Sequence, residues 1–330
     1  MLADIGPGLS RRTALKGLGA AGVVSLVSFA RPHPAQAQSD SPEAADLDAY
    51  PELEIIGDDY SFAMPTEFEG GLTRVTLVND GDEDHHAIFI RLGDSVTAED
   101  VDAAAANPDF GPMIGLGDIL GGPNGAAPGG GRSTAILDLA PGDYVVVCVI
   151  PDADGIPHYV HGMIAPLTVT ESASALEAPD SALTVELVDF DFDHLPAEIP
   201  SRQQVWEVIN VGQEPHELIV FQIAPGVPFA VIEGIFGGAP APASTPGHDE
   251  SESHEMDEAS PAAGMAASPA AMGPPFVTVA GIAPMNPGFT NWLVLDLAPG
   301  EYFAICFVPS PAMGGAPHFA LGMLMPFTVV

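Results

Sequence analysis

Basic residues are scarce in this sequence, whose 330 residues include 8 Lys and Arg against 45 Asp and Glu, a formal net charge of −37. Half of the basic residues precede residue 38, so the rest of the chain is more acidic still. Such a surface repels nucleic acid and anionic lipid, and we exclude both as partners. The acidity fits either solubility in strong salt or an acidic face for a basic partner, and charge alone does not separate these two.

A hydrophobic run long enough to cross a membrane is also missing from the N-terminal region. The uncharged stretch 17–30 is shorter than the roughly 20 apolar residues that a span requires. It follows Ser10-Arg11-Arg12-Thr13-Ala14-Leu15-Lys16, which resembles the twin-arginine export motif, and precedes a small-residue cleavage site at Ala35-Gln36-Ala37. We therefore predict a signal peptide over 1–37. The mature protein then lies outside the cytoplasm, in the periplasm, on the cell surface or secreted, without a transmembrane anchor.

Only two cysteines are present, Cys148 and Cys306. An even number of cysteines in an exported protein suggests a disulfide. However, the two residues occupy equivalent positions of an internal repeat, on equivalent strands of two domains. A disulfide needs Cα atoms within about 7 Å of each other, which equivalent central strands rarely achieve. We therefore predict two free thiols, one in each domain.

The repeat covers most of the chain. Val78–Phe89 aligns without a gap with Ile209–Val220, and Leu137–Tyr144 aligns with Leu295–Tyr302. Its period is far longer than the 20–50 residues of solenoid repeats, so it indicates a duplicated domain. The predicted boundaries are an acidic leader 38–50, domain one 51–171, a linker 172–181 and domain two 182–330, with a low-complexity insertion 238–274 that cannot bury a core.

Short strands separated by turns characterise each copy. In copy one, runs rich in Val, Ile, Thr and aromatics are bounded by Gly, Pro, Asn or Asp, which predicts a β-sandwich or barrel. The expected strands are Leu53–Phe62, Arg74–Val78, His86–Arg91, Ser133–Leu139, Tyr144–Ile150 and Leu167–Thr170. Short helices are expected at Thr97–Ala106 and, in copy two, at Pro228–Phe236.

The same four side-chain types recur in the same order in both copies, as one early histidine, a cysteine, a second histidine and a methionine. Two imidazoles, a thiolate and a weak thioether form the ligand set of a type 1 blue copper site. The candidate metal ligands are His85, Cys148, His158 and Met163 in copy one, and His216, Cys306, His318 and Met323 in copy two.

These segments resemble the cupredoxins, the family of plastocyanin and azurin. Glu214–Phe221 is similar to the family's Pro-His element, Tyr302–Cys306 to its cysteine strand, and Pro317–Met323 to its His-x4-Met unit. The resemblance implies an all-β fold of two tandem cupredoxin-like Greek-key β-sandwiches, one copper ion in each, and electron transfer with a redox partner protein. Copy one departs from it at Asp84, which stands in place of the proline.

The spacing between cysteine and second histidine is longer than in familiar cupredoxins, with nine residues between Cys148 and His158 and eleven between Cys306 and His318. A metal-free binding or structural module is therefore the alternative, in which the cysteines are small buried hydrophobes and the methionines fill the core. A copper-dependent oxidase or nitrite reductase is the enzymatic rival. Those enzymes need further copper held by His-x-His pairs or by histidines that flank the cysteine, and this sequence has neither. We therefore favour a non-enzymatic protein.

Overall fold

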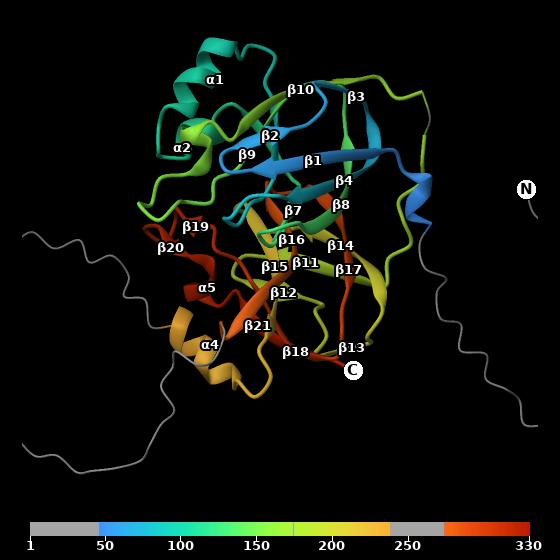
Figure 1. Cartoon of the computed structure of the whole chain (residues 1–330), viewed down its shortest axis with the longest axis vertical. Helices are drawn as coiled ribbons and strands as arrows, with labels where there is room; N and C mark the ends of the chain where they lie inside the picture. The colour runs from blue at the N-terminus through green and yellow to red at the C-terminus, as the bar shows by residue number, and fades with distance from the viewer. Residues whose placement is uncertain (1–45, 174, 238–273) are drawn as a thin grey trace, which may run out of the picture. The chain divides into compact units, whose positions relative to one another are not determined.

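A computed structural model describes residues 46–173, 175–237 and 274–330, which are built mainly from β-strands (Figure 1). The predicted signal peptide and all but the last residue of the predicted insertion lie outside these residues. Copy one contains the 3-10 helix η1 (Leu47–Ala49), helices α1 (Ala98–Ala105), α2 (Gly111–Ile114) and α3 (His158–His161), and strands β1 (Glu52–Asp58), β2 (Ser61–Ala63), β3 (Glu67–Glu69), β4 (Gly71–Asn79), β5 (Ile88–Leu92), β6 (Gly117–Gly121), β7 (Pro123–Asn124), β8 (Gly131–Leu139), β9 (Gly142–Val147) and β10 (Ile164–Thr170).

Copy two repeats this arrangement of short strands and short helices, and the predicted all-β class is confirmed. It contains helices α4 (Phe229–Phe236) and α5 (His318–Leu321), and strands β11 (Leu183–Val188), β12 (Asp191–Asp193), β13 (Glu198–Ile199), β14 (Gln203–Asn210), β15 (His216–Ile223), β16 (Phe276–Met285), β17 (Thr290–Asp296), β18 (Gly300–Ile305), β19 (Pro309–Ser310), β20 (Ala316–Pro317) and β21 (Leu324–Val329).

Alternation of apolar and polar residues explains which side of each outer strand is buried. In β1, Leu53 and Ile55 are fully buried while their neighbours are exposed, because successive side chains of a strand point to opposite faces. Strand β15 is buried on both faces. Its Leu218 and Val220 belong to the core between the sheets, whereas Ile219 and Phe221 pack in an outer cluster with α4. The position of α4 thus follows from an apolar outer face.

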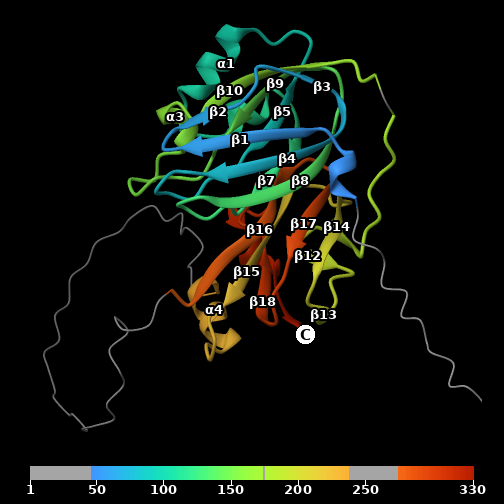
Figure 2. The same cartoon turned by 45° about the vertical axis from the view of Figure 1, so that its right-hand side comes forward.

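The two copies share their sheets. In an eight-stranded sheet, β8 of copy one pairs antiparallel with β17 of copy two, and in an eleven-stranded sheet β6 and β7 pair with β16. Figure 2 shows β1, β4 and β8 of the first sheet side by side. The apolar residues Ala135 and Leu293, which face each other across β8 and β17, are completely buried and join the copies in one core.

Both predicted helices are present, with α1 beginning after Thr97 and α4 after Pro228. Thr97 and Asp100 form a capping box, in which each side chain accepts a hydrogen bond from the other's backbone N–H. The expected strand Leu53–Phe62 is divided into β1 and β2, because the chain turns after Asp58 and the two strands pair antiparallel.

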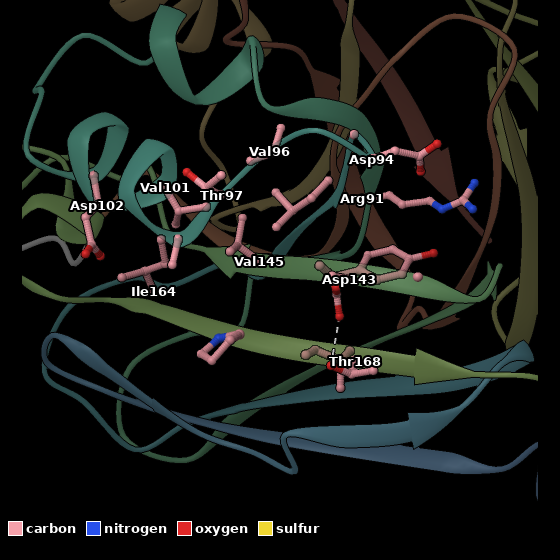
Figure 3. A pocket seen from close by; sticks show the side chains of 18 of the residues that line it. Arg91, Asp94, Val96, Thr97, Val101, Asp102, Asp143, Val145, Ile164 and Thr168 are labelled. Atoms are coloured by element: carbon pink, nitrogen blue, oxygen red, sulfur yellow. Dashed lines mark hydrogen bonds between the residues drawn. The ribbon is translucent and has the colours of Figure 1, made fainter.

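A cavity of about 680 Å³ lies between α1 and the strands β9 and β10 of copy one (Figure 3). Its wall carries Arg91, Asp102 and Val145, and a hydrogen bond of 2.9 Å from the Thr168 hydroxyl to Asp143 lies at its edge. None of the eight candidate ligands lines this cavity. The candidate metal groups are therefore separate from it.

Candidate metal centres

Each copy brings one cysteine and two histidines together. The ligand atoms of His85, Cys148 and His158 all lie within 4.8 Å of one another, and the same is true of His216, Cys306 and His318. All six residues have 0% solvent exposure. We call the first group centre one and the second group centre two. The structure thus assembles these six predicted ligands, and their binding of a metal stays a prediction.

The distances within each centre suit a shared ion. In centre one, Nδ1 of His158 lies 3.6 Å from Cys148 Sγ and 3.2 Å from Nδ1 of His85. In centre two, Nδ1 of His318 lies 3.4 Å from Cys306 Sγ. Ligands bonded to one ion at about 2.0–2.3 Å in tetrahedral geometry are themselves roughly 3.3–3.8 Å apart. The same ring atom, Nδ1, faces the sulfur in both copies.

The long connection from cysteine to second histidine folds back on itself, which is why it does not displace the histidine. In copy one, the His158 N–H donates to Ile150 O at 2.9 Å, and the Tyr159 N–H donates to Cys148 O at the same distance. In copy two, β19 and β20 pair within the connection, and the Phe319 N–H donates to Cys306 O at 2.9 Å. The extra residues therefore form a hairpin that projects from the centre.

One helical turn connects the second histidine to the methionine. Helix α3 begins after Pro157 and ends at Gly162, whose φ of 117° is the left-handed conformation that favours glycine. The turn brings the Met163 N–H to His158 O at 3.0 Å, and the Cys148 N–H donates to Met163 O at 3.1 Å. Met323 repeats these bonds in copy two, and both methionines are fully buried. Each predicted axial residue thus lies next to its centre.

Four carboxylates that sequence reasoning missed lie next to the outer ring nitrogens of the histidines. Nε2 of His85 lies 3.0 Å from Asp59, and Nε2 of His158 lies 2.8 Å from Glu83, although this second pair lacks hydrogen-bond geometry. The equivalent residues Asp189 and Glu214 lie 3.0 Å and 3.1 Å from Nε2 of the two histidines of copy two. A carboxylate on Nε2 retains a proton there and leaves the Nδ1 lone pair free for a metal. Glu83 and Glu214 occupy the same position of the gapless alignment, and this identity could have indicated their shared role.

Burial and these carboxylates shift the pKa values in opposite directions. Burial lowers the pKa of His216 and of His318, against their carboxylate partners, which raise it. Burial raises the pKa of Cys148 to about 12, so that without a metal its thiol is protonated at neutral pH. The pKa of Asp189 is lowered although burial raises it, because the Gln213 N–H and His216 donate to its carboxylate. The centres are therefore neutral at the thiol and anionic at the rim.

One buried nitrogen in centre two lacks any hydrogen-bond partner among the described residues. It is Nδ1 of His216, the atom that would bind a metal. A buried polar atom without a partner destabilises a fold by about 1–3 kcal/mol, so native proteins rarely contain one without a reason. A metal ion bonded to this nitrogen would remove the penalty. The donor set and this orphaned atom together fit a soft or borderline transition metal.

Two glycines leave room for the bond between the first histidine and its aspartate. A Cβ added to Gly212 would contact the Asp189 carboxylate and lie 2.7 Å from Nε2 of His216, and a Cβ added to Gly81 would likewise contact Asp59 and His85. Neither glycine is among the described residues with positive φ, so crowding is the constraint.

Replacing Gly212 with alanine is therefore expected to break the hydrogen bond between Asp189 and His216. Loss of such an outer-shell contact typically weakens metal binding by about 10–100-fold. A competition titration with a copper chelator would measure the affinity of centre two. Gly234→Ala in α4, where an added Cβ meets open space, is the control and should leave this affinity unchanged. Equal affinities in the two variants would contradict the crowding argument.

The residue after the first histidine is buried in both copies but differs in type. His86 Nε2 accepts the Val149 N–H at 2.8 Å, and Glu217 Oε1 accepts the Phe307 N–H at 2.8 Å. Both therefore tie the strand of the first histidine to the residue that follows the cysteine. His86, a residue without a match in copy two, thus has a structural contact of its own. Of the other histidines, His161 pairs with Asp152 at 2.8 Å, and His194 is exposed beside Glu186.

His86 gives the metal-free protein a predictable pH dependence. Burial lowers its pKa from 6.5 to about 3, with a further contribution from His158 and His85. Between these values the unfolded chain binds a proton that the folded chain does not, so stability falls as the pH falls through this window. The slope from this group is about 1.4 kcal/mol per pH unit. In urea unfolding at pH 6.5 and pH 5, His86→Gln, which keeps an acceptor for Val149, is expected to lose this part of the slope. An unchanged slope would mean that the pKa of His86 in the folded protein is close to its value in the unfolded chain.

Comparisons with known proteins give matches only among solved structures. No family model and no curated protein matches the chain. Reduced auracyanin from Roseiflexus castenholzii matches with 16% identity over 46% of this chain and 99% of its own, at a TM-score of 0.25. Auracyanin A, a "blue" copper protein from Chloroflexus aurantiacus, matches with 20% identity over 36% of this chain and 98% of its own, at a TM-score of 0.23.

A copper-containing nitrite reductase from Thermus scotoductus matches with 12% identity over 85% of this chain and 61% of its own, at a TM-score of 0.22. The likeness concerns the fold alone. TM-scores of this size carry no argument about function, which has to come from the two centres themselves.

Proposed function

We propose that each copy binds one copper ion in a type 1-like site and that the chain carries electrons. The observation that supports this most is the duplicated buried group of two imidazoles and one thiol. In each group Nδ1 of the second histidine faces the sulfur, and a carboxylate lies 3.0 Å from Nε2 of the first histidine. His85, Cys148 and His158 would hold the ion in centre one, and His216, Cys306 and His318 in centre two, with Met163 and Met323 as weak axial ligands.

A copper ion bound by these residues would supply one-electron chemistry between Cu(I) and Cu(II). The residues of the chain provide the rest of the function. The carboxylates orient the imidazole rings, and the buried strands that carry the ligands keep their positions the same in both oxidation states. Water is excluded from all six ligand side chains, each of which has 0% exposure.

The burial of the ligands favours an electron carrier over an enzyme. A catalytic metal site keeps an open position for substrate, whereas a closed site does not. Cys148 lies between Val147 and Val149, and Cys306 between Ile305 and Phe307, so no second copper ligand flanks either cysteine. The copper titration also distinguishes two alternative functions. These are a copper-dependent oxidase or nitrite reductase, and a metal-free module.

We propose an extracytoplasmic location from the predicted twin-arginine signal, which lies outside the described residues. Replacement of Arg11 and Arg12 by lysine is expected to retain the protein in the cytoplasm, and cell fractionation measures this. Normal export of that variant would exclude the twin-arginine route. As a separate finding, no helix among the described residues is long and apolar enough to cross a membrane.

Titration of the purified protein with copper tests the proposed function. We expect saturation at two ions per chain and the intense blue charge-transfer band of a Cu(II)–thiolate bond, with the small copper hyperfine splitting of a type 1 site in electron paramagnetic resonance. The band should vanish on reduction with ascorbate and return on reoxidation. Absence of the band at full copper loading would favour the metal-free module. Turnover of nitrite or of dioxygen would favour the enzyme.

A further inference from the structure

The two centres are matched in most of their surroundings. In each, an aspartate holds the first histidine and a glutamate holds the second. The glutamate in turn accepts a hydroxyl hydrogen bond in each copy, from Tyr60 at 3.2 Å in copy one and from Ser310 at 2.9 Å in copy two. The position that follows the first histidine breaks this match, because it carries an imidazole in copy one and a carboxyl group in copy two.

The Glu217 carboxylate is fixed by donors on both of its oxygens. Oε1 accepts the Phe307 N–H at 2.8 Å, and Oε2 accepts the side-chain amide of Asn124 at 3.2 Å. Asn124 belongs to copy one, so this bond crosses the junction between the copies. The Glu217 N–H points at Cys306 Sγ at 3.5 Å. An ionised carboxylate accepts at both oxygens, as Glu217 does here, and its charge lies next to the sulfur ligand.

Copy one has no buried charge at the equivalent place. His86 accepts the Val149 N–H through Nε2, which requires an unprotonated nitrogen. Copy one does carry an additional carboxylate at Asp84, where copy two has Pro215. Asp84 is exposed at its surface, although burial raises the pKa of its carboxyl group and its charge raises the pKa of the Cys148 thiol. Glu217 is only 4% exposed, and its backbone N–H contacts Cys306 Sγ. Water screens the charge of Glu217 less than that of Asp84, so we expect Glu217 to act more strongly on its own centre.

We propose that Glu217 gives centre two a lower reduction potential than centre one, so that an electron that enters the chain comes to rest in centre one. This inference rests on the proposed copper function. A copper site carries one more positive charge as Cu(II) than as Cu(I), so a nearby buried anion stabilises the oxidised form. In the internal step, centre two loses one electron and centre one gains it, and no proton moves. A one-electron donor protein would supply the electron through centre two, and an acceptor would remove it from centre one.

Single-centre variants allow the two potentials to be assigned. Cys148→Ser leaves only the thiolate of centre two, and Cys306→Ser leaves only that of centre one. Redox titration of each copper-loaded variant, monitored by the blue band, gives one potential apiece. Both titrations are done at the same alkaline pH. We expect the Cu(I)-to-Cu(II) ratio at a fixed solution potential to be at least tenfold higher in centre one, which corresponds to about 59 mV for one electron.

Substitutions at Glu217 and His86 then test whether these residues cause the difference in reduction potential. Glu217→Gln keeps the size of the side chain and removes the charge, and it should raise the ratio in centre two about tenfold. His86→Glu should lower the ratio in centre one. Glu301→Gln, which removes an exposed carboxylate from β18 of the same copy, is the matched control and should change either ratio less than twofold.

The outcomes separate this inference from the proposed function. Equal potentials of the two single-centre variants would overturn the inference, as would a Glu217→Gln protein whose centre two keeps its potential. A wild-type protein that shows no blue band at full copper loading would instead overturn the proposed copper function. If His86→Glu does not fold, the effect of Glu217→Gln decides the question alone, because that change preserves an acceptor for the Phe307 N–H.

Discussion

Replacing Cys306 with serine is expected to remove the Cu(II)–thiolate band of centre two completely and to leave that of centre one intact. The intensity of the band comes from the bond between copper and sulfur, which a serine oxygen cannot provide. Cys148→Ser should have the same effect on centre one, and the double variant should be colourless. The two single variants serve as each other's controls, because Cys148 and Cys306 lie in separate groups and are both free, buried thiols.

Absorption at defined copper loading measures this result, with the copper content determined independently. A band that keeps its full intensity in Cys306→Ser would place the thiolate site in copy one alone. A band that survives in the double variant would show that neither cysteine is a ligand. Serine fits the space of the thiol closely, and Cys306 has 0% exposure, so urea unfolding should confirm that each variant is folded before the spectra are compared.

The duplication of the chain is what pointed to the two groups of His and Cys, which the structure brings together. That they are metal ligands stays a prediction. Packing alone gives no reason for His, Cys and Met to recur in order while the connections between them differ in length. Cys148 and Cys306 each follow a strand that begins at a Pro-Gly turn, β9 and β18, and the structure places both at the same end of that strand. The local strand pattern thus predicts that each thiol lies directly after the end of its strand.

The outer contacts and the shared sheets were harder to predict. Asp59 reaches His85 from the turn between β1 and β2, a contact between residues 26 positions apart that no local pattern indicates. Strands β6 and β16 pair through backbone N–H and C=O groups, which the edge of any strand presents, so a sequence does not reveal that the partner belongs to the other copy. The connection between Cys306 and His318 contains two-residue strands too short to carry an alternating pattern.

Asn210 has the second large effect that we expect, and it concerns stability. Its fully buried side chain donates to Glu214 O at 2.9 Å and to Met285 O at 2.8 Å, and it accepts the Gly212 N–H at 3.0 Å. Asn210→Ala would remove three hydrogen bonds and deprive the Glu214 and Met285 carbonyl groups of these donors. Since loss of a buried hydrogen-bond partner costs about 1–3 kcal/mol, we expect a loss of roughly 3 kcal/mol in the free energy of unfolding.

The same substitution should weaken copper binding in centre two, because Asn210 shapes the turn that delivers His216. Met285, whose carbonyl group it binds, pairs directly with His216 across β15 and β16. Asn79 makes the equivalent bonds to Glu83 O and Ala126 O in copy one, and His85 pairs with Ala126. Asn79→Ala should therefore weaken centre one and spare centre two. Urea unfolding of the metal-free proteins and the blue band of each centre during copper titration measure the two effects separately. A variant that loses stability but binds copper with unchanged affinity in its own copy would show that the turn and the ligand are independent.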